Sequence, residues 1–264
     1  MSRARLVAPG AVVLAVLLAT LTGSCTDVST GPNEAVALAF DSLPYPSIVA
    51  GDTLRDSLGK VAPLRAVAYS ASGAVIQNPG IQYLALDSVL SVSSAGVATA
   101  RSRSGTGRFV AIVNGIQSVT KSLLVARRPD SVVATSSRDT TVLFTIPDSA
   151  ARNVTGALAL KITTTDTAGG ILATAGWLVS YQTFFRGAAL ASADTARVSL
   201  WDESGRVSMV DTTGADGSAS RRLRLRSLQL PTTPDSFVVI ATVRYRGAAV
   251  RGSPLRFVIR TRPR

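Results

Sequence analysis

The residues that perform most enzyme chemistry are scarce in this sequence. The 264-residue chain contains no histidine and a single cysteine, Cys25. Without histidine, Ser-His-Asp and Cys-His nucleophilic machinery, histidine-ligated metals and histidine general bases are all excluded. A single cysteine also rules out an intramolecular disulfide and a cysteine metal cluster. The sequence therefore removes most hydrolase and metalloenzyme classes.

Three patterns among the remaining residues contain groups known from catalytic or ion-binding sites. Ser118 and Lys121 have Ser-x-x-Lys spacing, but this spacing places both side chains on one face only in a helix, and the surrounding sequence predicts a strand. Asp202-Glu203 is interpreted as a hairpin turn rather than as two carboxylates across a cleft. Asp211 and Asp216 offer oxygens to calcium without the carboxylate density of a dedicated loop. We predict no catalytic residue, no metal site and no cofactor, and hence that the protein is not an enzyme.

Arginine is the most distinctive charged residue. The chain has 28 basic and 16 acidic residues, which gives a formal net charge of +12. In a strand over residues 222–226, buried leucines would leave the alternating arginines together on the opposite face, about 7 Å apart. Such a row suits phosphate or sulfate groups, whereas the alternative is a solvated face or charge that prevents edge-to-edge association. The candidate polyanion-binding residues are Arg222, Arg224, Arg226, Arg244 and Arg246.

Nucleic acid is not an expected partner of these arginines. The aromatic platforms on which a nucleic-acid binder stacks bases are missing, and only 5% of all residues are aromatic. The partners that fit the charge are lipopolysaccharide or a cell-wall polymer, and an unknown envelope protein remains an alternative.

Short strands must position these side chains. Apolar or alternating runs occur at residues 64–69, 81–86, 109–113 and 119–125, with turn signals such as Asn114-Gly115 between them. Strands at intervals of about ten residues predict a β-sandwich or barrel. We also expect a turn at Gly105-Thr106-Gly107. No window supports a long amphipathic helix, so the predicted fold class is all-β.

The second half continues in the same way. Strands are predicted at residues 158–164, 177–183, 198–201, 222–230, 237–246 and 255–260. Within 237–246, one face would carry the apolar side chains and the other Arg244 and Arg246; the apolar set is Phe237, Val239, Ala241, Val243 and Tyr245.

The first half also resembles a known family, the bacterial immunoglobulin-like domain of group 2. The resemblance covers residues 35–127 and rests on Gly51-Asp52-Thr53, on the segment 86–92, on Gly96-Val97-Ala98-Thr99-Ala100 and on the strand that follows Gly105. Residues 55–63 look like an insertion after the Gly-Asp-Thr turn. The resemblance implies a β-sandwich and says little about a ligand.

A second sandwich is predicted for residues 129–264. Residues 211–217, followed by a strand, resemble the turn-then-strand element of invasin-type bacterial immunoglobulin-like domains. Arg127-Arg128-Pro129 is the candidate domain boundary, because proline removes a ladder donor and paired charges mark an exposed segment. The sequence thus predicts two tandem immunoglobulin-like β-sandwiches.

The N-terminal residues predict export. Arg3 and Arg5 precede an apolar run at residues 6–21, which is short for a membrane span, and small residues then lead to Cys25. Residues 21–25 resemble the lipobox of bacterial lipoproteins, although Thr22 stands where the family has an aliphatic residue. We therefore expect residues 1–24 to be a signal peptide, Cys25 to carry lipid and residues 25–34 to be a tether. The resemblance implies an outer-membrane lipoprotein, and the alternative is a secreted or periplasmic protein.

These expectations combine into one functional hypothesis. The chain would be a lipid-anchored envelope protein whose immunoglobulin-like modules act as spacer, structural or adhesion domains. The alternative is an envelope polyanion-binding module that uses the arginine-rich face near the C-terminus.

Overall fold

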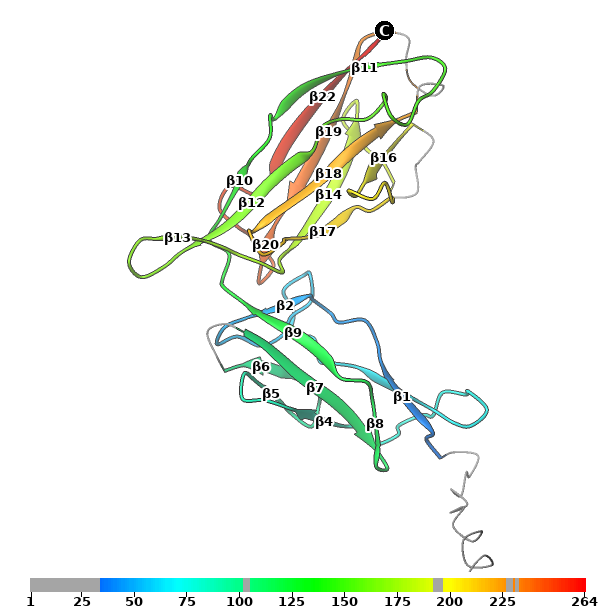
Figure 1. Cartoon of the computed structure of the whole chain (residues 1–264), viewed down its shortest axis with the longest axis vertical. Coiled ribbons are helices and arrows are strands. Elements are labelled where there is room, and N and C mark those ends of the chain that lie inside the picture. Colours follow the sequence, from blue (N-terminus) through cyan, green and yellow to red (C-terminus); the bar gives the residue numbers. More distant parts are fainter. Residues whose placement is uncertain (1–33, 102–104, 192–196, 227–229, 231–232) are drawn as a thin grey trace, which may run out of the picture.

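The computed structural model describes residues 34–101, 105–191, 197–226, 230 and 233–264. These residues form strands and turns without a helix, and they build two lobes that lie end to end along the long axis of the molecule (Figure 1). Accordingly, the described part of the chain has no helical segment with the length and apolarity needed to span a bilayer. The predicted fold class, all-β with two sandwiches, is confirmed.

The first sandwich has one continuous sheet and a second layer made of two strand pairs. The continuous sheet has the order β2-β9-β7-β4, with β8 paired to β7. The pairs are β1-β3 and β5-β6. The strand bounds are β1 Ala37–Phe40, β2 Ser47–Val49, β3 Ala66–Tyr69, β4 Gln82–Ala85, β5 Leu90–Val92, β6 Ala98–Ala100, β7 Gly105–Val113, β8 Ile116–Gln117 and β9 Lys121–Ala126.

The second sandwich has two larger sheets. One has the order β10-β12-β18-β16 with β13 paired to β12, and the other has the order β11-β22-β19-β14-β15 with β17 paired to β14. A small hairpin, β20-β21, stands apart. The bounds are β10 Ser131–Ala134, β11 Asp139–Phe144, β12 Leu158–Thr165, β13 Ile171–Ala173, β14 Leu178–Phe185, β15 Ala188–Ala189, β16 Val198–Trp201, β17 Val210–Thr212, β18 Ser218–Leu225, β19 Asp235–Thr242, β20 Arg244–Tyr245, β21 Ala248–Ala249 and β22 Leu255–Pro263.

Both sandwiches begin with a strand that is divided between the two layers. In the first, β1 pairs antiparallel with β3, and β2 then pairs parallel with the last strand, β9. In the second, β10 pairs antiparallel with β12, and β11 then pairs parallel with the last strand, β22. With the first strand lettered A, the second sandwich has the sheets A-B-E-D and A′-G-F-C. This is the immunoglobulin-type strand order.

The alternation predicted for the strand at 237–246 is observed. Phe237, Val239, Ala241 and Val243 are fully buried, while Arg244 is exposed. The four buried apolar residues belong to a hydrophobic cluster that also includes Ile48 and Leu123 of the first sandwich. Buried apolar contacts therefore run through both lobes.

The predicted turn at Gly105-Thr106-Gly107 is wrong, because these residues begin strand β7. The glycine at position 107 is required by packing rather than by turning. A Cβ atom there would lie 2.1 Å from the Leu90 Cγ atom, so only glycine lets β5 and β7 approach this closely.

Many strand connections use the same five-residue turn. In the Asp202 example, the Asp202 amide donates to the Arg206 carbonyl, and the Gly205 amide donates to the Asp202 carbonyl. The Asp202 carboxylate accepts further bonds from the Ser204 and Arg206 amides, each 2.9 Å long. Asp56 and Asp166 make the same bonds in their own turns. The aspartate replaces the ladder partners that the chain loses where it reverses.

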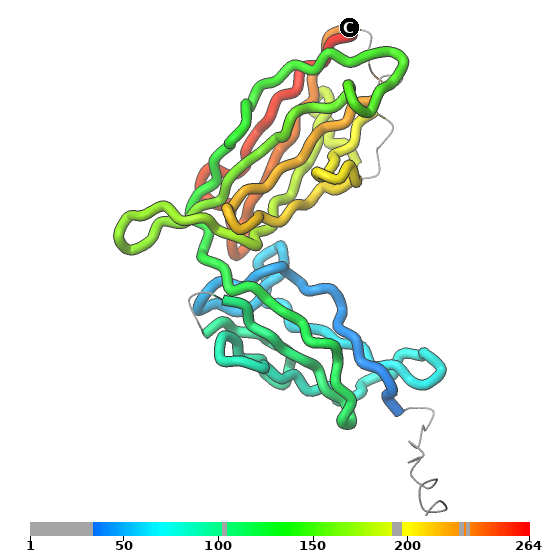
Figure 2. The backbone as a smooth tube through the Cα atoms, in the orientation of Figure 1, coloured from blue at the N-terminus to red at the C-terminus, as the bar shows by residue number. Residues whose placement is uncertain are grey.

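The connection between the sandwiches is short and partly tied down. Strand β9 ends at Ala126 and β10 begins at Ser131, with Pro129 buried between them. The Asp130 amide donates to the Thr163 carbonyl, and the Asp130 carboxylate accepts from the Thr165 amide at 2.9 Å. The chain trace passes between the lobes with no looped-out segment at this point (Figure 2). The boundary at residues 127–129 stays a prediction, because folding of the separated halves is what defines it.

Candidate functional site: the junction between the two sandwiches

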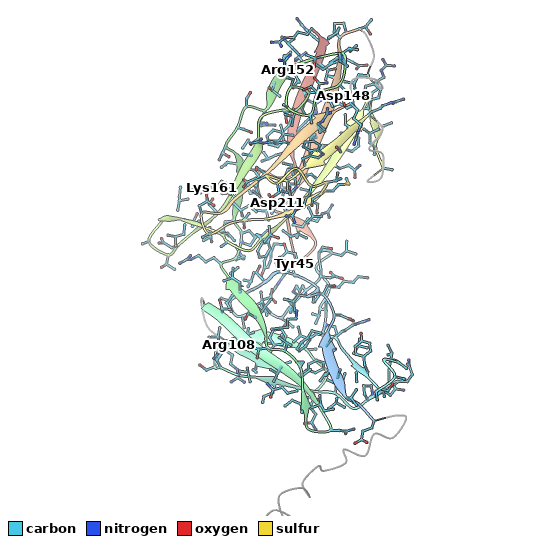
Figure 3. The ribbon with its side chains drawn as sticks, turned by 45° about the vertical axis from the view of Figure 1, so that its right-hand side comes forward. Tyr45, Arg108, Asp148, Arg152, Lys161 and Asp211 are labelled. Carbon is cyan, nitrogen blue, oxygen red and sulfur yellow. The ribbon has the colours of Figure 1, made fainter. Side chains whose placement is uncertain are left out.

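Three aromatic rings fill the space where the lobes meet. Tyr45 precedes β2, Trp177 precedes β14 and Tyr245 lies in β20. The Tyr45 and Trp177 ring centroids are 5.3 Å apart, and those of Trp177 and Tyr245 are 6.0 Å apart. Figure 3 shows Tyr45 at the level where the two lobes meet. Aromatic pairs at these separations add about 0.5–1.5 kcal/mol beyond the area that they bury.

Two hydrogen bonds cross the junction beside these rings. The Leu178 amide donates to the Tyr45 hydroxyl oxygen at 3.1 Å. The Ser47 hydroxyl donates to the Gly176 carbonyl at 2.7 Å. Burial raises the pKa of the Tyr45 hydroxyl well above its usual value, against the opposing effect of the Leu178 amide, so this side chain stays neutral.

Asp52 is the ionic centre of the junction. Its side chain is only 7% exposed. From the second sandwich, Arg246 Nε lies 2.9 Å and the Tyr245 hydroxyl 3.1 Å from the Asp52 Oδ2 atom. From the first sandwich, Arg55 Nη2 lies 3.2 Å from Oδ1, and the Thr53 amide donates to Oδ1 at 2.8 Å. Each carboxylate oxygen is therefore held by at least two donors.

These donors decide the ionisation of Asp52. Burial by itself would raise the pKa of this carboxyl group. Hydrogen bonds from Arg246, the Thr53 amide, Arg55 and Tyr245 outweigh burial and hold the pKa of Asp52 far below its usual range. Burial raises the pKa of Tyr245, and the Asp52 carboxylate raises it further. Asp52 is thus a permanent anion at neutral pH and Tyr245 a permanent donor.

The backbones of the two sandwiches are in close contact at the turn that follows Asp52 in the sequence. The turn at residues 56–60 belongs to the segment that looks like an insertion in the sequence. A Cβ atom on Gly59 would lie 2.2 Å from the Arg246 carbonyl carbon, and one on Gly247 would lie 2.8 Å from the Leu58 carbonyl oxygen. Both glycines also have positive φ angles, +85° and +81°. No larger residue fits at either position without moving the lobes apart.

Thr213 positions the second sandwich's part of the junction. Its hydroxyl donates to the Thr174 carbonyl at 2.7 Å and accepts from the Trp177 amide at 2.9 Å. The Trp177 indole in turn donates to the Arg244 carbonyl at 3.2 Å, which ties it to the β20-β21 hairpin. The rings are therefore held in place from within the second sandwich.

The centre of the junction is too tightly packed to be a ligand pocket, although an open groove of about 330 Å³ lies beside it between Leu58 and Arg244. The cavity left among Tyr45, Asp52, Trp177 and Tyr245 has a volume of about 30 Å³. This volume corresponds to a single water molecule, whereas small-molecule pockets have about 300–1,000 Å³. What the arrangement does physically is fix the angle between two sandwiches through ring packing, hydrogen bonds and a buried carboxylate.

The predicted arginine row on β18 is only partly formed. Arg222 and Arg226 are exposed, as the alternation predicts, and Leu223 and Leu225 are fully buried. Arg224 is 4% exposed, so the expectation of three exposed arginines together is wrong.

A loop covers Arg224. The segment 148–154 lies over it, and the Arg224 guanidinium makes a 2.6 Å ion pair with the Asp148 carboxylate while lying 5.7 Å above the Trp201 ring. Sequence alternation places a residue on a face, but does not show which loop packs on that face.

The other two predicted arginines belong to the junction. Arg246 binds Asp52, and Arg244 Nη1 donates to the Gly247 carbonyl at 3.1 Å. Neither lies on β18. The five residues of the predicted polyanion site are therefore divided between two places, and polyanion binding by them stays a prediction.

A buried arginine that the sequence reasoning missed lies next to the row. Arg221 is 5% exposed and makes a 2.9 Å ion pair with Asp211, with its guanidinium 5.9 Å from the Tyr181 ring. The doubled Arg221-Arg222 was the available signal, because adjacent residues in a strand face opposite ways and one of the two must point inward.

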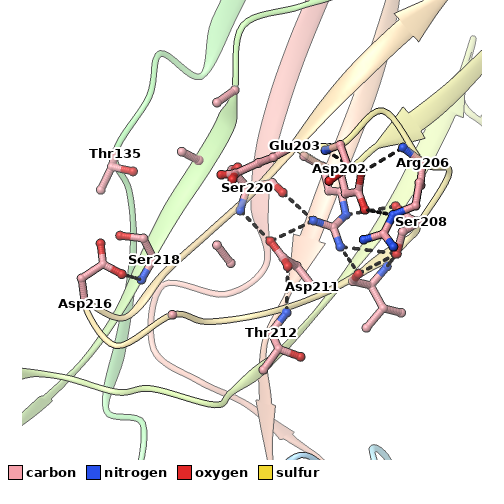
Figure 4. Close-up of a pocket in the computed structure, with 17 residues that line it drawn as sticks. Thr135, Asp202, Glu203, Arg206, Ser208, Asp211, Thr212, Asp216, Ser218 and Ser220 are labelled. Atoms are coloured by element: carbon pink, nitrogen blue, oxygen red, sulfur yellow. Dashed lines mark hydrogen bonds and ion pairs between the residues drawn. The ribbon is translucent and has the colours of Figure 1, made fainter.

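The clustered acids line an open polar groove of about 840 Å³ on the second sandwich (Figure 4). Asp211 binds Arg221, and Asp202 binds Arg206 at 2.9 Å. Bonds from the Arg206 amide lower the pKa of Asp202, and the Ser218 amide lowers that of Asp216. A general acid needs the opposite shift. Within the described residues, no three acidic, histidine or cysteine side chains are placed to hold a metal ion.

Two predictions remain, the Ser118–Lys121 pair and the lipidated Cys25. The Ser118 hydroxyl is buried, accepts from the Ala111 amide at 3.0 Å and donates to the Val119 carbonyl, while Lys121 is exposed on β9. The serine is thus committed to backbone groups. Cys25 and the predicted signal peptide lie outside the described residues, so their lipidation and removal stay predictions.

Comparisons with known proteins find likeness only among solved structures. No family model and no curated protein matches the chain. The adhesin InvE of Yersinia pseudotuberculosis matches over 85% of this chain and 58% of its own, at 11% identity and a TM-score of 0.33. The D0-D1 domain of intimin matches over 86% and 98%, at 12% identity and a TM-score of 0.29. The Escherichia coli adhesin FdeC matches over 87% and 65%, at 18% identity and a TM-score of 0.28.

The chain therefore spans less than two thirds of the InvE and FdeC chains. Likenesses at these identities and TM-scores carry no functional information. The immunoglobulin-type strand order is observed in the chain itself, and membership of the group 2 or invasin-type families stays a prediction.

Proposed function

We propose that this chain is an exported, lipid-anchored and non-catalytic spacer that holds its second sandwich at a fixed distance and angle from the cell envelope. The observation that carries the proposal is the junction. Two modules joined flexibly would not need a buried carboxylate, three packed aromatic rings and two glycines that lie against the backbone of the other module. A spacer needs such a joint, because its reach depends on the angle between its modules.

The positions of the first described strand and of the C-terminus support this role. The first described strand, β1, lies at the end of the first lobe that is far from the junction, and Arg264 lies at the far end of the second lobe (Figure 1). An anchor at Cys25, through a tether of residues 25–34, would join the envelope to the far end of the first sandwich. The two sandwiches would then add their lengths outward. Structural and adhesive roles both use this geometry.

The chemistry of the described residues supports a non-catalytic role. The acids of the large groove hold turns or pair with arginine, and the Ser118 hydroxyl bonds to backbone. Catalysis by such groups would require breaking contacts that stabilise the fold.

The proposal is tested by measuring the height of each sandwich above a membrane. The lipidated chain is reconstituted in vesicles that carry a quencher on their surface, with a fluorophore on Gln82→Cys of β4 or on Thr141→Cys of β11, both exposed positions. The lipid occupies the native thiol, so each variant has one site for label. We expect strong quenching of the Gln82 label and weak quenching of the Thr141 label. Equal quenching of the two labels would contradict the spacer.

A further inference from the structure

A second row of arginines, absent from the predicted site, lies on strand β22. Leu255, Phe257 and Ile259 of this strand are buried in the core. The alternate positions Arg256, Arg260 and Arg262 are exposed on the outer face of the sheet. From Arg256 to Arg262 the row is about 20 Å long, at 3.3 Å per residue.

The position of β22 in the sheet bears on the simplest explanation of such charge. Arginines on an edge strand prevent pairing with another sheet. Strand β22 lies inside its sheet, because β11 pairs with residues 258–263 on one side and β19 with residues 255–261 on the other. Arg260 has strand partners on both sides and protects no free backbone, whereas Arg256 and Arg262 each have a strand partner on one side only. Edge protection therefore does not account for all three arginines on this face.

One carboxylate, Asp139 of β11, compensates part of this charge. Arg260 makes a 2.7 Å ion pair with it. The hydrogen bond from Arg260 lowers the pKa of Asp139, and Arg256 also helps to lower it through its charge. Neither Arg256 nor Arg262 makes an ion pair within the described part of the chain. The Arg138 side chain adds a further cation, since its Nε donates to the Arg256 carbonyl at 3.3 Å.

The side chains between and beside the arginines are apolar. Ile240 of β19 lies opposite Arg256, and Val238 lies opposite Val258. All three apolar side chains are half-buried on this outer face. A strand face with cations at intervals and apolar side chains between them suits a chain of rings that carry anionic substituents. A compact ligand would need a pocket instead.

From this arrangement we propose that the outer face of β22 binds a linear anionic polysaccharide along the arginine row. Guanidinium groups offer paired donors to sulfate or phosphate oxygens, and the sugar rings lie on Val238, Ile240 and Val258. Strand β22 runs along the length of the second lobe (Figure 1), and its arginines are exposed to solvent. The inference is independent of the spacer proposal, because it uses no junction residue.

The test uses heparin fragments of increasing length as the probe and the full chain purified in detergent. Binding is measured by calorimetry at low salt for the parent, for Arg256→Gln/Arg262→Gln and for a control with the same loss of charge, Arg65→Gln/Arg101→Gln. The control residues are exposed on the first sandwich. We expect the β22 variant to lose about tenfold or more in affinity, which corresponds to about 1.4 kcal/mol, while the control stays within about twofold of the parent.

Two further features are expected of the parent. Its affinity should rise with fragment length until the fragment spans the row and should then level off. It should also fall steeply with added salt, and less steeply in the β22 variant, because contacts to charged groups displace counterions or are screened.

Three results would overturn the proposal. Equal losses in the β22 variant and the control would show attraction to net charge alone. Unchanged binding in the β22 variant would show that the row is a solvated face. In a Cys25→Ser chain, which has no lipid, vesicles of anionic phospholipid that bind more tightly than heparin does, and lose binding after Arg256→Gln/Arg262→Gln, would assign the face to a membrane. Unfolding midpoints of all variants, measured alongside, should match the parent, since exposed charges contribute little to stability.

Discussion

The Arg246 guanidinium of the second sandwich lies 2.9 Å from the Asp52 carboxylate of the first, and 194 residues of sequence separate the two. The same oxygen of Asp52 accepts a hydrogen bond from the Tyr245 hydroxyl. One buried carboxylate therefore takes donors from both modules: Arg55 and the Thr53 amide from the first, Arg246 and Tyr245 from the second. Separating the lobes would replace the bonds from Arg246 and Tyr245 with bonds to water, so the junction is stabilised by the difference between these two sets of bonds.

Asp52→Asn should destabilise the protein by about 1–3 kcal/mol at neutral pH, because the side chain keeps its shape but loses charge-assisted bonds. The pKa of Asp52 is lowered in the folded state from an ordinary value of 3.8. Its contribution is therefore fully present above that value and is lost as pH falls below it toward the lowered folded pKa. Urea unfolding of both proteins from pH 7 to pH 2.5 measures the difference.

The gap between parent and Asp52→Asn should be constant above about pH 5 and should shrink in acid. The comparison removes the effects of the other aspartates, which both proteins share. A gap that stays unchanged down to pH 2.5 would show that the charge of Asp52 does not stabilise the junction.

Gly59→Ala should loosen the junction, and Gly73→Ala is its matched control. Both positions have positive φ angles, +85° and +79°, so each substitution strains the backbone by about 1 kcal/mol. Only at Gly59 would the new Cβ atom meet the other lobe; at Gly73 nothing lies within 4 Å. Small-angle scattering should show a wider range of shapes for Gly59→Ala alone. Identical scattering from the two variants would mean that the contact with Arg246 is not needed.

Arg224→Ala and Arg222→Ala test the corrected description of β18. Arg224 is buried against Asp148, so its removal leaves a carboxylate without its guanidinium and should cost about 2–4 kcal/mol. Arg222 is exposed on the same strand, and its removal should change stability by less than about 0.5 kcal/mol. Thermal and urea unfolding report both values. Equal, small losses of stability in the two variants would show that Arg224 is exposed to solvent, as strand alternation predicts.

The mature protein is expected to begin at Cys25 and to carry lipid on that residue. Mass spectrometry of the chain isolated from its native envelope measures this directly. Cys25→Ser should release the protein or leave its precursor unprocessed. An unmodified N-terminus at another residue would show that the lipobox resemblance is misleading.

The strands of this fold follow from local sequence, whereas its contacts between distant segments do not. The alternation at residues 237–246 predicts the buried face correctly, because a strand of a sandwich packs one face on the core and turns the other outward. Gly107 looks like part of a turn until the Leu90 side chain, which lies across the sandwich, is known. Arg224 looks exposed because the loop that covers it comes from 70 residues earlier in the chain. No local pattern contains that information.

The junction was hidden from the sequence for the same reason. Asp52 belongs to a turn motif and Arg246 to a predicted basic face of a strand. Neither local pattern predicts that the two residues are in contact. The insertion after Asp52 was the available signal. Its turn supplies Gly59, which lies against the Arg246-Gly247 backbone.

The most direct test of the fixed junction is the distance between the two sandwiches in solution. Spin labels on Ser122→Cys of β9 and Ser180→Cys of β14, both exposed, are placed in a Cys25→Ser chain and measured by double electron-electron resonance. A rigid junction predicts one narrow distance distribution centred on the value in the structure, and a broad one after Asp52→Ala and Tyr45→Ala are introduced together. A broad distribution in the parent chain would contradict the account.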